Sequence, residues 1–231
     1  MKQFFLLALL LFSFYFLTLS QEVDFNIGIG TSTFTEKTPD NTSLQDPKFS
    51  LNTGIGIRHA LTKRISLYSG VQINVKRSGF SYNEYKTNYE FEYNSKSSLF
   101  SASIPITLNY DIPLGKNRIQ LGAGGFLGVN IFATQKYNWK LTLDGETYYN
   151  LGSGNLKFKD QAEGDEIYDV RRIDIGLKWS ISYNLKRISL RLDSEYGLRN
   201  LSQYENSVGQ LLTRSLWLSV SIPLNSEMKQ E

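Results

Sequence analysis

Apolar and polar residues alternate with a period of two in eight separate stretches of the chain. In the clearest stretch, the odd positions from 173 to 185 are apolar or aromatic, while the even positions from 172 to 184 are polar, charged or glycine. Successive side chains of a strand point to opposite faces, and a tilted strand of about ten residues crosses a bilayer. Because an open sheet edge would leave backbone groups unpaired in lipid, such strands must close into a barrel.

The other seven stretches are residues 22–31, 49–59, 65–75, 100–110, 119–131, 188–198 and 216–222. Short and long connections alternate between them, and the long ones span residues 32–48, 77–97, 133–168 and 200–212. This pattern is typical of outer-membrane barrels. It predicts an all-β fold, an eight-stranded antiparallel up-and-down transmembrane β-barrel with short periplasmic turns and long extracellular loops. A soluble barrel would need the reverse arrangement, with polar residues facing outward and apolar residues facing inward.

The first twenty residues have the composition of a signal peptide, with Lys2 ahead of an apolar run at residues 4–19. Cleavage after Ser20 would leave residues 21–231 as the outer-membrane barrel domain. A helical anchor is the alternative, but a polar, strand-like segment follows at once without a positively charged flank. The sequence has no cysteine, so disulfides and thiolate metal sites are excluded. These features predict export to a bacterial outer membrane.

The charge balance and the single histidine exclude several classes of function. Without Lys2 the chain has 24 basic and 22 acidic residues, which is too even to indicate a nucleic-acid partner. One histidine, His59, cannot build a catalytic triad or a histidine-rich zinc site. The acidic residues between 160 and 169 lack the spacing of a calcium loop, which favours a solvated loop over a metal site. We therefore expect no catalytic residues, no metal and no cofactor.

Three short segments resemble a known family. Residues 103–110 (SIPITLNY), residues 196–201 (YGLRNL) and residues 174–177 (DIGL) are similar to segments of the PorT-like outer-membrane β-barrel family. The resemblance extends over essentially the whole chain after residue 20. It implies a small eight-stranded barrel in the outer membrane, without common catalytic residues. Some members of that family are parts of a secretion machinery.

The polar face of each predicted strand points into the barrel, and this places charged side chains in its interior. The interior of an eight-stranded barrel is just wide enough for side chains, and charges withdrawn from water persist only when they are paired. We therefore expect an ion-pair network that plugs the lumen, with a narrow pore as the alternative. The predicted inward charges are Asp24, Arg58, Lys76, Asp111, Arg172, Asp174, Lys178, Arg191, Asp193, Glu195 and Arg199.

Two of the long connections alternate aromatic and polar residues. In the third connection Asp144-Gly145 separates two alternating segments, which is a strong hairpin signal. The aromatic residues are either a recognition surface or cross-strand pairs that stiffen an extended hairpin. The candidate recognition residues are Phe80, Tyr82, Tyr89, Phe91, Tyr93, Tyr137 and Trp139.

These observations predict a non-enzymatic outer-membrane barrel, with a structural or a ligand- or partner-binding role through its extracellular loops. Its expected partners are outer-membrane lipid and an extracellular ligand or an envelope protein complex. The alternatives are an accessory subunit of an envelope secretion or transport complex, and a narrow pore. An enzymatic barrel would need clustered histidine, serine or aspartate at its rim, and His59 lies beside a periplasmic turn.

Overall fold

A computed structural model describes residues 21–37, 42–156, 171–185, 187–201 and 210–224. The predicted signal peptide at residues 1–20 and the acidic residues between 160 and 169 lie outside the described residues. Within the described part of the chain, no helix is long and apolar enough to cross a membrane.

Eight strands close a ring within the described residues, as the sequence predicts. Each pairs antiparallel with the next, and the last returns to pair with the first. Two further strands, β2 (Thr42–Leu44) and β7 (Glu146–Leu156), add to β1 and β6. The ring consists of β1 (Gln21–Lys37), β3 (Asp46–Ala60), β4 (Ile65–Lys86), β5 (Tyr89–Leu114), β6 (Asn117–Leu143), β8 (Ile173–Asn184), β9 (Ser189–Gly197) and β10 (Gln210–Pro223).

The two faces of the ring differ in polarity in the way the alternation predicts. Along β8 every odd residue is exposed and every even residue is buried. The exposed residues of the ring are mostly large and apolar, such as Ile27, Ile106 and Leu218, each more than half exposed. Charged and amide side chains are buried inside, together with Tyr68 and Trp217. An apolar exterior around a polar interior suits a barrel surrounded by lipid.

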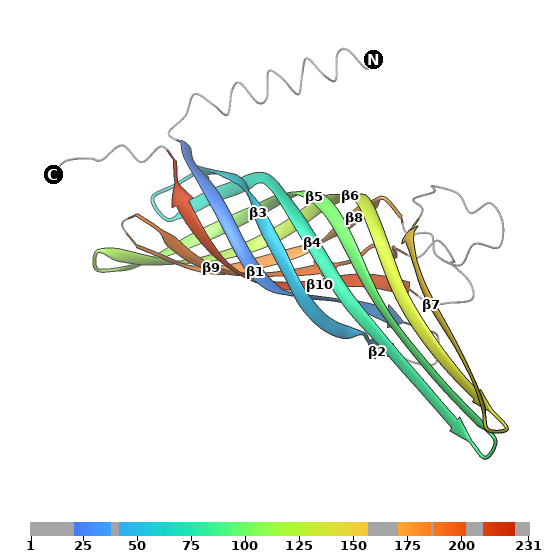
Figure 1. Cartoon of the computed structure of the whole chain (residues 1–231). Coiled ribbons are helices and arrows are strands. Elements are labelled where there is room, and N and C mark those ends of the chain that lie inside the picture. Colours follow the sequence, from blue (N-terminus) through green and yellow to red (C-terminus); the bar gives the residue numbers. More distant parts are fainter. Residues whose placement is uncertain (1–20, 38–41, 157–170, 186, 202–209, 225–231) are drawn as a thin grey trace, which may run out of the picture.

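The two ends of the barrel differ in their connections (Figure 1). Short turns join β3 to β4, β5 to β6 and β8 to β9, at the end where β1 begins and β10 finishes. At the opposite end β4, β5, β6 and β7 run well beyond the ring. The short turns mark the periplasmic end, and the projecting strands mark the extracellular end.

The connection at residues 77–97 is not a loop, because β4 and β5 continue through it with their hydrogen-bonded register intact. They are 22 and 26 residues long, far longer than the segments the sequence predicts there. The predicted hairpin at Asp144-Gly145 is confirmed, with positive φ angles of 49° and 87° at the turn. Since β6 also pairs with β5 and β7, the result is a four-stranded sheet rather than two separate hairpins. This sheet, residues 79–86, 89–97, 133–143 and β7, is called the extension below.

A β-bulge marks the border between the barrel and the extension on β6. Ser101 pairs with Asn130, but Phe100 pairs with Phe132, so Ile131 is an extra residue. Ile131 and Phe132 are consecutive, yet both are about half exposed. Below the bulge the odd residues of β6 face outward, and above it the odd residues face inward, as buried Ala133 shows.

Candidate functional site: a filled lumen and an aromatic extension

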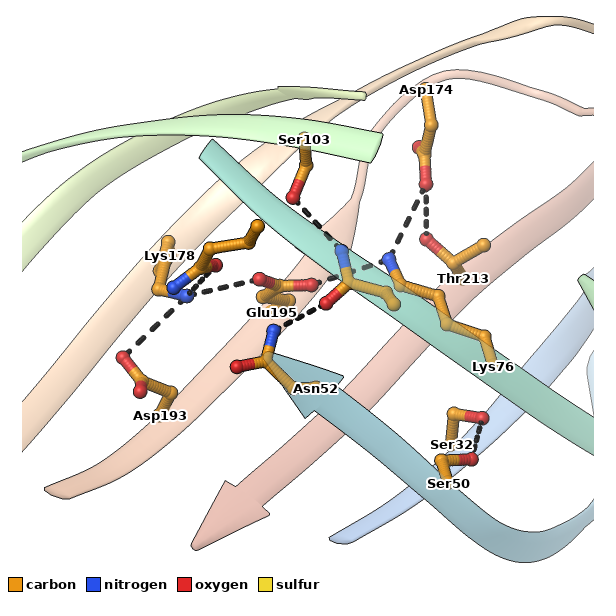
Figure 2. A network of polar contacts seen from close by, with 12 residues as sticks. Ser32, Ser50, Asn52, Lys76, Ser103, Asp174, Lys178, Asp193, Glu195 and Thr213 are labelled. Carbon is orange, nitrogen blue, oxygen red and sulfur yellow. Dashed lines mark hydrogen bonds and ion pairs between the residues drawn. The ribbon is translucent and has the colours of Figure 1, made fainter. Parts of the chain in front are cut away.

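Alternating buried cations and carboxylates form the centre of the lumen (Figure 2). Glu195 of β9 lies between two lysines, 3.2 Å from Lys76 Nζ and 3.0 Å from Lys178 Nζ. Lys76 is also 3.7 Å from Asp174, and Lys178 is 3.6 Å from Asp193. All five side chains are at most 4 % exposed. Each charge is compensated inside the barrel, which is the condition for keeping ions in a space shielded from water.

The network continues toward the periplasmic end through Arg191. Its Nε donates to Asp193 at 2.8 Å, and its guanidinium lies 4.4 Å from the centre of the Tyr68 ring. Tyr68 is fully buried, and Gly56 faces it from β3, where a Cβ atom would overlap the Tyr68 hydroxyl. Asp24 is buried beside the same glycine. Small and large side chains thus fill the lumen together.

A second charged group lies at the periplasmic end. Arg58 donates to Glu22 at 2.7 Å, and Arg118 donates to the same carboxylate oxygen at 3.4 Å. Arg118 also lies 3.3 Å from Asp111, which is half-buried. A cavity of about 370 Å³ opens between β1 and the short turns beside Glu22 and Arg118. The side-chain packing therefore leaves space at this end.

Of the eleven charges that the sequence predicts inside the barrel, Asp111 is half-buried at the periplasmic end, and eight are buried. They are Asp24, Arg58, Lys76, Asp174, Lys178, Arg191, Asp193 and Glu195. Among the described residues, the other two make no contact with this network. Arg172 is exposed just before β8 begins, and Arg199 is half-buried after β9 has ended. In both cases the strand alternation was extended past the point where the strand stops, and beyond that point it no longer determines the face of a side chain.

Neutral polar residues complete the network, and the charge pattern did not identify them. Gln72 accepts a hydrogen bond from Lys178 at 3.1 Å, and Thr213 donates to Asp174 at 2.9 Å. Asn74 bonds to Asn52 and donates to Ser103 at 2.9 Å. These residues occupy the inward-facing alternate positions of their strands, so the alternation that identified the inward charges also indicates them. They supply the hydrogen bonds that buried charges need besides an ion pair.

An apolar cluster covers the extracellular end of the lumen. It consists of Phe34, Leu99, Ala133 and Leu201, with Leu211 packed against it. Leu201 is fully buried, and its backbone is held by hydrogen bonds to Leu211 and Arg171, both 2.8 Å long. Apolar side chains without polar groups offer no path for ions. The central charges and this cluster together favour a plug over an open channel.

All seven aromatic residues of the predicted recognition surface lie on the inner face of the extension, the face that continues the barrel interior. The face follows from the strand register together with buried Ser78, Ser95 and Ala133 below it. Their rings pair across strands. The ring centres are 6.1 Å apart for Phe80 and Tyr93, 6.3 Å for Tyr82 and Phe91, 6.5 Å for Phe91 and Trp139, and 6.5 Å for Tyr93 and Tyr137.

The outer face of the extension is polar along β5 and β6, whereas Tyr85 on β4 and Tyr149 and Leu151 on β7 are exposed on the same face. Lys140 lies 3.7 Å from Glu90 and 3.6 Å from Glu92, and these two carboxylates raise the pKa of its ammonium group. On the inner face, hydrogen bonds from Lys86 and Tyr82 lower the pKa of the Glu84 carboxyl. These exposed contacts contribute little to stability. They show that the charged groups of the extension are exposed to solvent.

Among the described residues, no group of three or more histidine, cysteine, aspartate or glutamate side chains is arranged to hold a metal ion. The predicted calcium alternative concerned residues 160–169, which lie outside the described residues.

A closed antiparallel ring with an apolar exterior agrees with the comparison to known families. The family described as "Outer membrane protein beta-barrel domain" matches residues 18–203, which is most of the chain. The chain belongs to this family. The protein is therefore an outer-membrane β-barrel protein, as the sequence predicts.

Several solved outer-membrane proteins are similar in structure. Ail, the attachment invasion locus protein of Yersinia pestis, is 10 % identical, with 89 % of this chain and 99 % of Ail covered and a TM-score of 0.36. Neisserial surface protein A is 15 % identical, with coverages of 86 % and 96 % and a TM-score of 0.34. OprG of Pseudomonas aeruginosa is 9 % identical, with coverages of 90 % and 99 % and a TM-score of 0.38. The comparison with curated proteins found no match.

Proposed function

We propose that this non-enzymatic outer-membrane barrel presents its extension to an extracellular partner, which binds the aromatic inner face. One observation supports this proposal above all. Along β4, β5 and β6 the large apolar side chains face outward toward lipid in the barrel, whereas in the extension most of those on the same three strands lie on the opposite face. The extension is therefore built to stand in water.

An aromatic face in water costs free energy unless something covers it. Tyr82, Leu143 and Tyr148 on this face are each about half exposed. Ring pairing alone explains a stiff hairpin, but it does not require a face with this much exposed apolar surface. Aromatic side chains on a rigid sheet also lose little entropy on binding, which suits recognition.

A photocrosslinking amino acid at Tyr82 tests the proposal in intact cells, with Tyr85 on the outer face of the same strand as the matched control. Both residues are exposed, at 45 % and 63 %. We expect a discrete protein or glycan adduct from position 82, none from position 85, and loss of the adduct in Phe91→Ser/Trp139→Ser. Equal labelling at the two positions, or labelling at 82 that survives this double substitution, would refute a binding face and leave the stiffening role.

The accessory-subunit role in a secretion machinery is the second candidate, supported by the resemblance to PorT-like barrels. The residues of that resemblance have structural roles in this chain. Leu201 is part of the apolar cluster, and Asn200 Oδ1 accepts a hydrogen bond from Leu211 N at 2.8 Å. The resemblance therefore supports the fold more than the role. A defined envelope complex that co-purifies with the protein would favour the second candidate under two conditions. The complex must be lost with Tyr85→Ser/Tyr149→Ser and retained with Phe91→Ser/Trp139→Ser.

The narrow-pore alternative has the least support, because the central charges are paired and an apolar cluster covers them. Planar-bilayer recordings of the purified protein test it directly. We expect no stable conductance. A steady open channel would support the pore and contradict the plug.

A further inference from the structure

Two lysines lie directly opposite each other on the outer face, where the barrel passes into the extension. Lys96 of β5 and Lys136 of β6 are register partners, and both are exposed. Opposed residues on one face of a sheet have Cβ atoms about 5 Å apart, and like charges in this arrangement destabilise the pair. Within the described residues, neither lysine has an ion-pair partner. The nearest acid above them on this face, Glu92, is already engaged by Lys140.

Two more cations join this pair. Gly79 is the register partner of Lys96 on β4, and the side chain of Lys48 lies across it, where a Cβ atom at Gly79 would overlap Lys48 Cε. Arg77 is exposed two residues before Gly79 on the same strand. Lys48 contacts one carboxylate, Asp46, at 3.7 Å. We call Lys48, Arg77, Lys96 and Lys136 the basic cluster. With Asp46 included it has four cations and one anion.

The basic cluster lies just above the lipid-facing band. Phe100 and Phe132 stack at 4.8 Å on the outer face, four residues below Lys96 and Lys136. Four residues of strand measure about 14 Å, or about 10 Å in height at a tilt of about 45°. The polar layer on each side of a bilayer is about 5–7 Å thick, and lysine stems bend toward it over several ångströms. The ammonium groups therefore reach the level of the outer-leaflet headgroups.

We propose that the basic cluster binds the phosphorylated headgroup of an outer-leaflet lipid, whose acyl chains lie along Phe132 and the apolar band below. A phosphate between Lys96 and Lys136 offsets the repulsion that their direct opposition creates. The open space at Gly79 brings the amine of Lys48 onto the same side. This site is separate from the aromatic inner face, so it does not depend on the proposed partner.

Lipid titration of the purified full chain, with bound lipid counted by native mass spectrometry, tests the assignment. The probes are phosphorylated lipid A, its dephosphorylated counterpart and phosphatidylcholine, with inorganic phosphate as a competitor. Each lysine near an anionic surface contributes roughly fivefold to binding. We expect Lys96→Gln/Lys136→Gln to weaken binding of phosphorylated lipid A by about 30-fold, and Lys96→Arg/Lys136→Arg to retain it.

Lys63→Gln/Lys116→Gln is the matched control, because it removes two exposed lysines from the periplasmic turns. It should bind like the unchanged protein. Gly79→Ala moves Lys48 without removing a charge, and we expect it to weaken binding while heat-modifiable migration on gels confirms folding. Equal binding of dephosphorylated lipid A, an equal loss in the control, or complete displacement by millimolar inorganic phosphate would each overturn the assignment. So would an acidic protein that occupies the cluster in place of lipid.

Discussion

Replacing Glu195 with glutamine removes the central charge of the lumen while preserving the size of the side chain. Glu195 lies between Lys76 and Lys178, and all three side chains are at most 2 % exposed. In the central network three cations, Lys76, Lys178 and Arg191, match three carboxylates, Asp174, Asp193 and Glu195. The variant leaves one buried positive charge without compensation.

Breaking a buried ion pair by removing one partner costs about 3–5 kcal/mol. Each lysine keeps a second carboxylate, but at the longer distances of 3.7 Å to Asp174 and 3.6 Å to Asp193. We therefore expect a loss near the lower limit, about 3 kcal/mol. Adding Lys178→Gln restores the balance of charges. The double variant should be more stable than the sum of the two single losses predicts, by about 1–3 kcal/mol.

Urea titrations of the protein folded into lipid vesicles measure these losses, followed by gel migration and by the fluorescence of buried Trp217. Glu84→Gln is the control, because it removes a carboxylate from an exposed pair with Lys86, and it should leave the midpoint unchanged. A loss below about 1 kcal/mol for Glu195→Gln, or additivity of the two single substitutions, would mean that water screens the lumen. That result would contradict the plug.

Three other changes have defined outcomes. Gly30→Ala should prevent assembly, because its Cβ would overlap the backbone carbonyl of Leu216 where β1 closes on β10. The heat-modifiable band of the folded protein should disappear from gels. Gly154→Ala, at an exposed position, should fold normally. Leu201→Ala should cost about 2–5 kcal/mol in urea titrations by leaving a cavity in the apolar cluster, with exposed Leu198→Ala as the comparison. Tyr82→Ser should leave the urea midpoint of the barrel unchanged, since the extension lies outside the ring, and a large shift would show that the two fold as one unit.

The strand alternation predicted the ring because lipid imposes it on every strand. Each spanning residue must face either hydrocarbon or the lumen, so the period of two is nearly unbroken there. The extension is not subject to this constraint, and its strands were therefore predicted as long loops with local hairpins. β4 and β5 show the change in their sequences. Apolar positions are odd at 65–75 and even at 80 and 82 on β4, and even at 100–110 and odd at 89–93 on β5.

The partners in the lumen could not be predicted in the same way. The phase identifies which charges face inward, but the stagger of the strands decides which of them meet. Lys76 on β4 contacts Asp174 on β8 and Glu195 on β9 across the interior, where no sheet register relates them directly. Glu22 illustrates the limit, since it has the same parity as the inward-facing Asp24, but its contacts with Arg58 and Arg118 depend on how β1, β3 and β6 are staggered.

Most apolar residues of β4, β5 and β6 move from the outer face in the barrel to the inner face in the extension. The bulge on β6 explains how this strand makes the change while its apolar residues stay at odd positions. On β6 the apolar positions stay odd from 119–131 to 137–143, although β4 and β5 change parity. The extra residue Ile131 turns the odd positions above it inward, so that Trp139 faces the same side as its register partner Tyr93. A single inserted residue therefore aligns the three strands.

Two matched deletions test this explanation. Deleting Ile131 removes the bulge but leaves Asn130 opposite Ser101 and Phe132 opposite Phe100. We expect this variant to fold, and cysteines at positions 93 and 139 should still be joined by a short thiol crosslinker. Deleting Ala123 instead shifts the residues up to the bulge by one position, which turns buried Phe126 and Asn130 toward lipid. That variant should not assemble. Because both variants lose one outward-facing residue from the same strand, similar behaviour of the two would mean that the bulge does not set the faces of the extension.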